Sequence, residues 1–236
     1  MSGGPYYSIS WSPSAPLPNR RTSRTELVHL AVAFLVLTVD LIIILSGRGL
    51  LEGGTVSGLI SPVPVYFVLL AVAAASTGFI AHEMAHKLVA RHLGYWAEFR
   101  MWPMGLLFSL ITSAGGFLFA APGATMVNGM DPRDVRGWGE TGVAGPVANL
   151  VFAAVFYAGS LGTFRISLEL SGPLLFLALI NTLFAAFNML PFGPLDGAKV
   201  LRWGTGRWLT VFVVAAASLV VTYTAFYSYG SPFLAW

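Results

Sequence analysis

The chain has 236 residues, of which 56% are hydrophobic and only 10% are charged. Soluble domains carry about 25% charged residues, so this composition excludes an ordinary soluble domain and predicts an all-α polytopic membrane protein. The formal net charge of +3 does not indicate a nucleic-acid partner, because in so apolar a chain the positions of Lys and Arg mainly report membrane topology. The sequence contains no cysteine, so a bound metal would need nitrogen and oxygen ligands.

The N-terminal part combines a polar tail with an apolar run. Residues 1–26 are predicted to form a cytoplasmic tail, and the run at about 27–45 is the first predicted transmembrane helix. Arginines just before the run hold its N-terminus in the cytoplasm. Asp40 lies inside the run, where it either pairs with a polar group on another helix or lies near the outer membrane interface, and we favour the interface.

A second helix, predicted at about 65–92, carries an H-E-x-x-H motif near its end. On a helix, His82 and His86 share a face one turn apart, so their imidazoles can bind one metal ion. Glu83 lies beside that face, where it can take a proton from a metal-bound water. At 1.5 Å per residue, His82 comes about 26 Å along the helix, which places the metal inside the bilayer near its cytoplasmic side.

The segment 101–127 carries no charge but is interrupted by prolines and glycines, which argue against a straight helix. If it does not cross the membrane, only Arg48 and Arg165 lie outside, and Lys87 and Arg91 emerge at the cytoplasmic surface. If it crosses, the two sides carry almost equal numbers of basic residues. The positive-inside rule therefore predicts a re-entrant or hairpin element that enters and leaves by the same face. Such an element would suit a gate or an edge that pairs with an extended substrate.

Three further helices are predicted, at about 142–161, 173–190 and 208–227. Residues 27–229 would then form a single membrane-embedded domain, with a C-terminal tail at 230–236 on the outer side. Gly145 and Asn149 share one face of the third helix, which would let a neighbouring helix approach closely. Plain small-residue packing explains this pair at least equally well.

A break rich in proline and glycine follows the fourth helix, and Asp196 lies in it. The break is near the cytoplasmic end of its helix, just as His86 is near that end of the second helix. Because the depths match, Asp196 is the predicted third metal ligand. Glu98 and Glu140 are the competing oxygen ligands, and both are expected to be exposed at the membrane interface.

Two motifs make the chain resemble the site-2 proteases, a family of intramembrane zinc metalloproteases. The first is the H-E-x-x-H of residues 82–86, and the second is N-x-x-P-x-x-P-x-D-G from Asn188 to Gly197. The stretch 144–149 resembles the small-residue motif that opens the family's intervening helix, and 101–127 would match its membrane-associated hairpin region. The chain differs from several relatives in having five predicted crossings rather than six, with no inserted PDZ module and no appended nucleotide-binding domain.

The resemblance implies that His82, His86 and Asp196 bind one Zn²⁺ and that Glu83 is the catalytic base. It also implies that Asn188 helps to hold the substrate carbonyl or its oxyanion. The implied activity is hydrolysis of peptide bonds in or near transmembrane segments, with a transmembrane protein as substrate and the lipid bilayer as the surroundings.

Two other functions remain open from the residues alone. A membrane metalloprotease of the H-E-x-x-H…E kind would use Glu98 or Glu140 as its third ligand. A transporter would use the intramembrane His and Asp residues as an ion-coupling site, although the sequence shows no inverted repeat. The substrate and the oligomeric state are not predicted.

Overall fold

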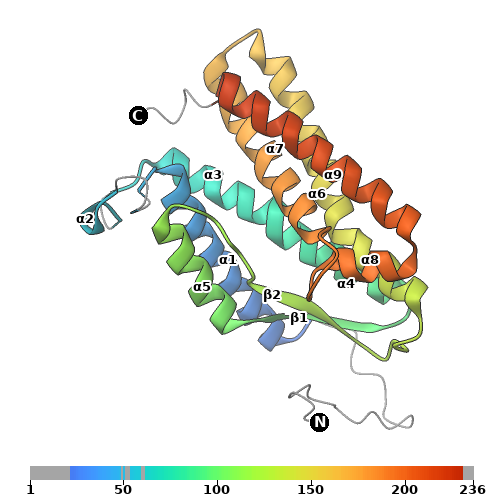
Figure 1. Ribbon diagram of the computed structural model, residues 1–236. Helices are drawn as coiled ribbons and strands as arrows, with labels where there is room; N and C mark the ends of the chain where they lie inside the picture. The colour runs from blue at the N-terminus through green and yellow to red at the C-terminus, as the bar shows by residue number, and fades with distance from the viewer. Residues whose placement is uncertain (1–21, 49, 51–53, 60–61, 231–236) are drawn as a thin grey trace.

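The computed structural model describes residues 22–230 except 49, 51–53, 60 and 61 (Figure 1). Most of the predicted cytoplasmic tail and nearly all of the C-terminal tail therefore lie outside the described residues.

In the described part of the chain, five helices are long and apolar enough to cross a membrane. They are α1 (Arg24–Leu45), the continuous helix made of α3 (Val65–Ala75), η2 (Ser76–Ile80) and α4 (Ala81–His92), then α6 (Val135–Phe164), α7 (Leu168–Asn188) and α9 (Thr205–Ala225), which η3 (Phe226–Gly230) extends. These helices confirm the prediction of an all-α polytopic membrane protein. The shorter helices are α2 (Val56–Leu59), α5 (Pro103–Gly115) and α8 (Asp196–Trp203).

The helix boundaries differ from the prediction mainly at their N-terminal ends. Helix α6 begins at Val135 rather than 142, because the Asp134 carboxylate accepts a hydrogen bond of 2.9 Å from the backbone N–H of Gly137 and caps the helix. Helix α7 begins at Leu168 rather than 173, so Pro173 lies inside it. Helix α9 begins at Thr205 rather than 208.

The π-helical turn η2 lies directly before the H-E-x-x-H motif. π-helical turns are rare and occur mostly as single-turn bulges inside α-helices. The side-chain amide of Asn149 on α6 donates to two backbone carbonyls of this turn, those of Thr77 at 3.3 Å and Gly78 at 3.0 Å. The turn therefore fastens the motif helix to α6 at one defined point.

The predicted hairpin region is a strand–helix–strand unit. Strand β1 (Trp96–Met101) pairs antiparallel with β2 (Gly123–Asn128), and α5 lies between them in sequence. Figure 1 shows the two strands side by side at one end of the helices, with α5 alongside α1. The sequence analysis did not predict this two-stranded sheet, which begins at 96, before the expected segment.

Buried apolar residues join these units into one body. One cluster packs α1, α3 and α7 through residues such as Leu41, Phe67 and Ile180. A second cluster contains Phe79 of η2 and Phe99 of β1, whose rings meet edge to face at 5.4 Å. The sheet is thus held against the helix that carries the motif.

Two polar residues lie in environments that differ from those predicted. Asp40 is fully buried and accepts a hydrogen bond of 2.8 Å from the Ser113 hydroxyl on α5, so it has a polar partner on another helix, the alternative that the sequence analysis did not favour. Lys87 was expected at the cytoplasmic surface, but it is 3% exposed and forms an ion pair with the fully buried Glu26 of α1. Arg91 is partly exposed.

Candidate metal centre

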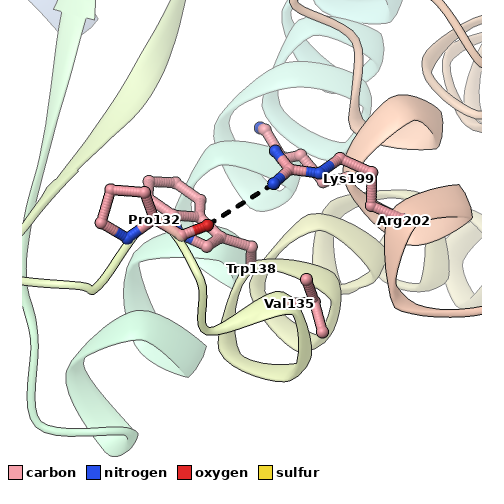
Figure 2. A pocket seen from close by; sticks show the side chains of 5 residues that line it. All are labelled: Pro132, Val135, Trp138, Lys199 and Arg202. Atoms are coloured by element: carbon pink, nitrogen blue, oxygen red, sulfur yellow. Dashed lines mark hydrogen bonds between the residues drawn. The ribbon is translucent and has the colours of Figure 1, made fainter.

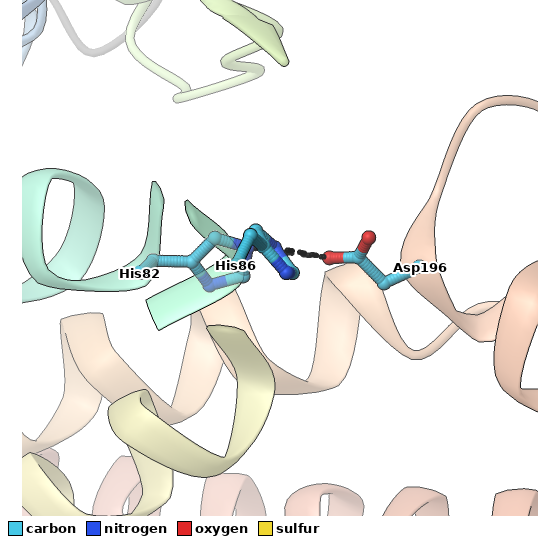
Figure 3. Close-up of side chains that lie close together, drawn as sticks. All are labelled: His82, His86 and Asp196. Carbon is cyan, nitrogen blue, oxygen red and sulfur yellow. Dashed lines mark ion pairs between the residues drawn. The ribbon is translucent and has the colours of Figure 1, made fainter. Parts of the chain in front are cut away.

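The structure brings together His82, His86 and Asp196, all of which are buried (Figure 3). The two histidines come from successive turns of α4, and Asp196 is the first residue of α8. Asp196 Oδ2 lies 3.3 Å from His82 Nε2 and 3.0 Å from His86 Nε2. One nitrogen from each imidazole and one carboxylate oxygen therefore face a common point.

This arrangement fits a zinc ion. Tetrahedral zinc binds nitrogen and oxygen at about 2.0–2.2 Å, which separates neighbouring donor atoms by about 3.3 Å. The measured separations of 3.0 and 3.3 Å between Asp196 Oδ2 and the imidazole nitrogens are close to that value. Three protein ligands would leave a fourth coordination position for water or substrate.

Both histidines are held in the tautomer that a metal requires. The Nδ1 atom of His86 donates to the backbone carbonyl of Thr141 at 2.7 Å, and Nδ1 of His82 lies 2.6 Å from Asn149 Oδ1. The Asn149 amide nitrogen faces three acceptors, including Asn181 Oδ1 at 3.1 Å, so its oxygen must face His82. Protonated Nδ1 atoms leave each Nε2 lone pair for a metal.

Two glycines permit the close approaches that assemble the site. A Cβ atom on Gly145 of α6 would lie 2.5 Å from His86 Nε2 and 2.6 Å from His82 Nε2. A Cβ atom on Gly197 would lie 2.2 Å from the backbone oxygen of Met189, where α8 crosses the end of α7. A side chain at Gly145 would separate α4 from α6 or turn the imidazoles, and a side chain at Gly197 would push α8 away from the end of α7.

Lys199 holds the free oxygen of the aspartate. Its ammonium group donates to Asp196 Oδ1 at 2.8 Å. Burial acts to raise the pKa of the Asp196 carboxyl, but the neighbouring His86 and Lys199 outweigh it and hold that pKa well below its usual value. Burial acts to lower the pKa of Lys199, but the nearby carboxylate of Asp196 raises it. The ligand therefore stays in its charged form.

A cavity of about 280 Å³ opens beside Lys199 (Figure 2). Lys199 and Arg202 of α8 line one part of it, and Pro132, Val135 and Trp138 line the rest. Lys199 thus contacts both this cavity and the carboxylate of Asp196.

Glu83 is 7% exposed and lies on α4 next to His82. Its Oε2 atom accepts a hydrogen bond of 2.7 Å from the hydroxyl of Thr125 on β2. A fixed carboxylate beside a metal position can accept a proton from water and return it to a leaving group.

The competing carboxylates lie elsewhere. Glu98 is buried, so its expected exposure is wrong, and it accepts hydrogen bonds from Ser23 at 2.8 Å and Arg100 at 2.7 Å. Burial acts to raise the Glu98 pKa, but these hydrogen bonds and the Arg100 charge lower it overall. Glu140 pairs with Arg136 at 2.6 Å. Among the described residues, neither glutamate belongs to the group formed around His82 and His86.

Asn188 is the last residue of α7, and its amide donates to the backbone carbonyl of Phe184 at 3.0 Å. It lines a small pocket of about 50 Å³ together with Phe119 and Phe187. The predicted contact between Asn188 and a substrate carbonyl remains a prediction.

Four residues around the site were not predicted as functional. They are Thr125, Thr141, Asn149 and Lys199. Asn149 had a signal, because it shares a helix face with Gly145 at a spacing of four residues. Thr125 had none, since its role depends on which strand reaches Glu83 in three dimensions.

The fold and this site define a multi-pass membrane protein with a candidate metal centre of the kind used by zinc peptidases. No protein-family model matches the chain, and no solved structure matches it significantly. The chain is 38% identical over 146 residues to "Putative zinc metalloprotease MJ0611" of Methanocaldococcus jannaschii, covering 61% of this chain and 74% of that protein. It is 32% identical over 154 residues to "Putative zinc metalloprotease Rip3" of Mycobacterium tuberculosis, covering 63% of this chain and 34% of Rip3. The chain belongs to the site-2 protease family of zinc metalloproteases.

Proposed function

We propose that the protein is an intramembrane zinc endopeptidase that hydrolyses peptide bonds in or near transmembrane segments of other membrane proteins. The observation that carries this proposal is the buried group of His82, His86 and Asp196, with Glu83 beside it. Both histidines and Glu83 lie on a helix that is long and apolar enough to cross the membrane. Buried ionisable side chains at membrane depth are costly unless they share a partner or a function.

The ligand set assigns a role to each side chain. His82, His86 and Asp196 would hold one Zn²⁺, which when bound supplies a Lewis acid that activates water at neutral pH. Glu83 takes the proton released by the attacking water and delivers it to the leaving amine. We assign to Asn188 a hydrogen bond to the substrate carbonyl as it gains negative charge, after its amide turns away from the Phe184 carbonyl.

A substrate helix must unwind before it can be cut, because its peptide groups are shielded by helical hydrogen bonds. Strand β2 offers an edge for the unwound segment. The N–H of Trp102 donates to the Pro122 carbonyl at 2.9 Å, whereas the N–H of Phe99 donates away from β2 to Glu26 at 3.1 Å. In an antiparallel ladder, pairs that exchange backbone hydrogen bonds alternate with pairs that do not. Phe99 and Thr125 form a pair that does not. The backbone N–H and C=O groups of Thr125 therefore point away from β1, toward the outer edge of β2.

Among the residues that the structure describes, no backbone hydrogen bond occupies that outer side of Thr125. An extended substrate can therefore add a third strand there, and its main-chain hydrogen bonds would replace those lost from its own helix. The occupant that we propose is the unwound part of a transmembrane protein in the surrounding lipid bilayer. We propose no nucleic-acid partner.

The membrane orientation follows from charge. We propose that the N-terminus and the ends of α4 and α7 face the cytoplasm and that α9 leads to a C-terminus outside, since this arrangement leaves only Arg48 and Arg165 on the outer side. The strands β1 and β2 then lie on the cytoplasmic side of the protein.

The test uses purified full-length protein in detergent with a generic transmembrane substrate. We expect the wild type to bind about one zinc per chain and to cleave. Glu83→Gln should keep zinc and lose cleavage, whereas Asp196→Ala should lose or weaken zinc binding. Zinc binding that survives Asp196→Ala unchanged would move the third-ligand role to Glu98 or Glu140. A folded wild type without zinc or cleavage would favour the transporter.

A further inference from the structure

Thr125 connects the sheet to the proposed catalytic base. Its hydroxyl donates to Glu83 Oε2 at 2.7 Å and lies 3.2 Å from the backbone carbonyl of the same residue. Exposure alternates along β2, with Ala124 and Met126 exposed and Thr125 partly buried. The side chain of Thr125 therefore faces α4, as the strand period of two requires.

The backbone of the same residue belongs to the free edge. Because Phe99 donates its N–H to Glu26, the Phe99–Thr125 pair is one of those that do not exchange hydrogen bonds. The N–H and C=O groups of Thr125 are thus among those that an added strand would meet first. One residue presents its backbone to the proposed substrate position and its hydroxyl to Glu83.

We propose that Thr125 is a positioning residue that links pairing of the substrate on β2 to the orientation of the Glu83 carboxylate. This inference rests on the proposed function. A threonine hydroxyl carries a single proton, and here it has two acceptors on Glu83. A strand added to the outer edge restricts the movement of β2. The Thr125 hydroxyl then keeps donating its hydrogen bond to the Glu83 carboxylate rather than to the Glu83 carbonyl, and this bond holds the carboxylate toward the metal position.

The test compares Thr125→Val, which keeps the shape and removes the hydroxyl, with Thr125→Ser, which keeps the hydroxyl. A hydrogen bond to a charged group is worth enough for a loss of about tenfold to hundredfold. We expect Thr125→Val to lower kcat by about that factor with KM within about twofold of the wild type, and Thr125→Ser to retain most of kcat. Zinc content should stay unchanged in both, because neither removes a ligand.

Thr210→Val is the matched control, since Thr210 is exposed on α9 and its hydroxyl bonds only to the Gly206 carbonyl of its own helix. It should cleave like the wild type. The inference is overturned if Thr125→Val cleaves at the wild-type rate, or if Thr125→Ser is as slow as Thr125→Val, because then the hydroxyl has no part in the effect.

Amide hydrogen exchange supplies a readout that needs no turnover. In Glu83→Gln protein, bound substrate should protect the backbone amides of Thr125 and Val127, which share the outer edge, and adding Thr125→Val should leave that protection in place. If adding Thr125→Val removed this protection, the hydroxyl would be needed for substrate binding itself, and the proposal that it acts by orienting Glu83 would be overturned. A wild type that binds zinc but cuts nothing would overturn both proposals, whereas normal cleavage by Thr125→Val in an active wild type overturns this one alone.

Discussion

At the scale of single residues, Asn149 tests how strongly zinc binding depends on a side chain that holds a proposed ligand in place without binding the metal itself. Its oxygen accepts from His82 Nδ1 at 2.6 Å, and its nitrogen donates to the carbonyl of Gly78 in the π-turn at 3.0 Å. Asn149→Ala removes these bonds, together with those to the Thr77 carbonyl and the Asn181 side chain, and frees the ring of His82 to rotate. We expect zinc affinity to fall by about 10- to 100-fold, measured by competition with a chelator of known affinity.

Ser160→Ala is a suitable comparison, because Ser160 is buried in the same helix and its hydroxyl bonds only to the Tyr157 carbonyl. Its zinc affinity should match that of the wild type. Equal affinities for Asn149→Ala and Ser160→Ala would show that the His82 ring is held by packing alone.

The residues that could be predicted from the sequence are those whose relation is local or set by depth. The spacing of His82 and His86 is fixed by the helix, and Asp196 was found because two helix ends match in depth. The partners of Lys87 and Asp40 could not be predicted, since each lies on a helix or strand far away in sequence. Hydropathy places charged residues such as Lys87 and Asp40 at the surface. Only the three-dimensional fold shows that each is buried next to a polar side chain that forms a hydrogen bond with it.

At the scale of elements, the approach of α6 to α4 depends on one missing side chain. Gly145→Ala would place a methyl group 2.5 Å from His86 Nε2, which is far inside van der Waals contact. The two helices must separate or the imidazoles must turn. We expect zinc binding and cleavage to be lost while the helical content by circular dichroism is unchanged, because alanine favours the helix.

Gly162→Ala is the control in the same helix, since a Cβ atom there meets no atom within 4 Å. It should leave zinc binding intact and stabilise the protein slightly, if at all. Normal zinc content in Gly145→Ala would mean that α6 can shift without disturbing the metal site.

The long helices were predicted well, whereas the unit between β1 and β2 was not. An apolar run of about twenty residues has few alternatives in a membrane. The strands are short, β2 carries no charge, and the segment between them is rich in glycine and proline, so nothing local distinguishes the strands from irregular backbone. Their register depends on contacts with α1 and α4.

At the scale of the whole molecule, the first helix is tied to the catalytic part by a buried charge pair. Glu26 at the start of α1 forms an ion pair with Lys87, the residue that follows His86, and its other oxygen accepts the Phe99 N–H of β1 at 3.1 Å. The same helix reaches α5 through Asp40 and Ser113. Helix α1 therefore contacts both the motif helix and the strand–helix–strand unit, and its position should affect the stability of the entire fold.

Breaking this pair from one side should be far more costly than removing both charges. Glu26→Gln or Lys87→Met leaves an unpaired buried charge, for which we expect a loss of about 3–5 kcal/mol in the free energy of unfolding. The double variant Glu26→Gln/Lys87→Met has no such charge and should recover much of that loss, measured by reversible unfolding in mixed detergent micelles. If the losses of the two single variants simply add in the double variant, the pair contributes no coupling, and α1 is held by its apolar contacts with α3 and α5 instead.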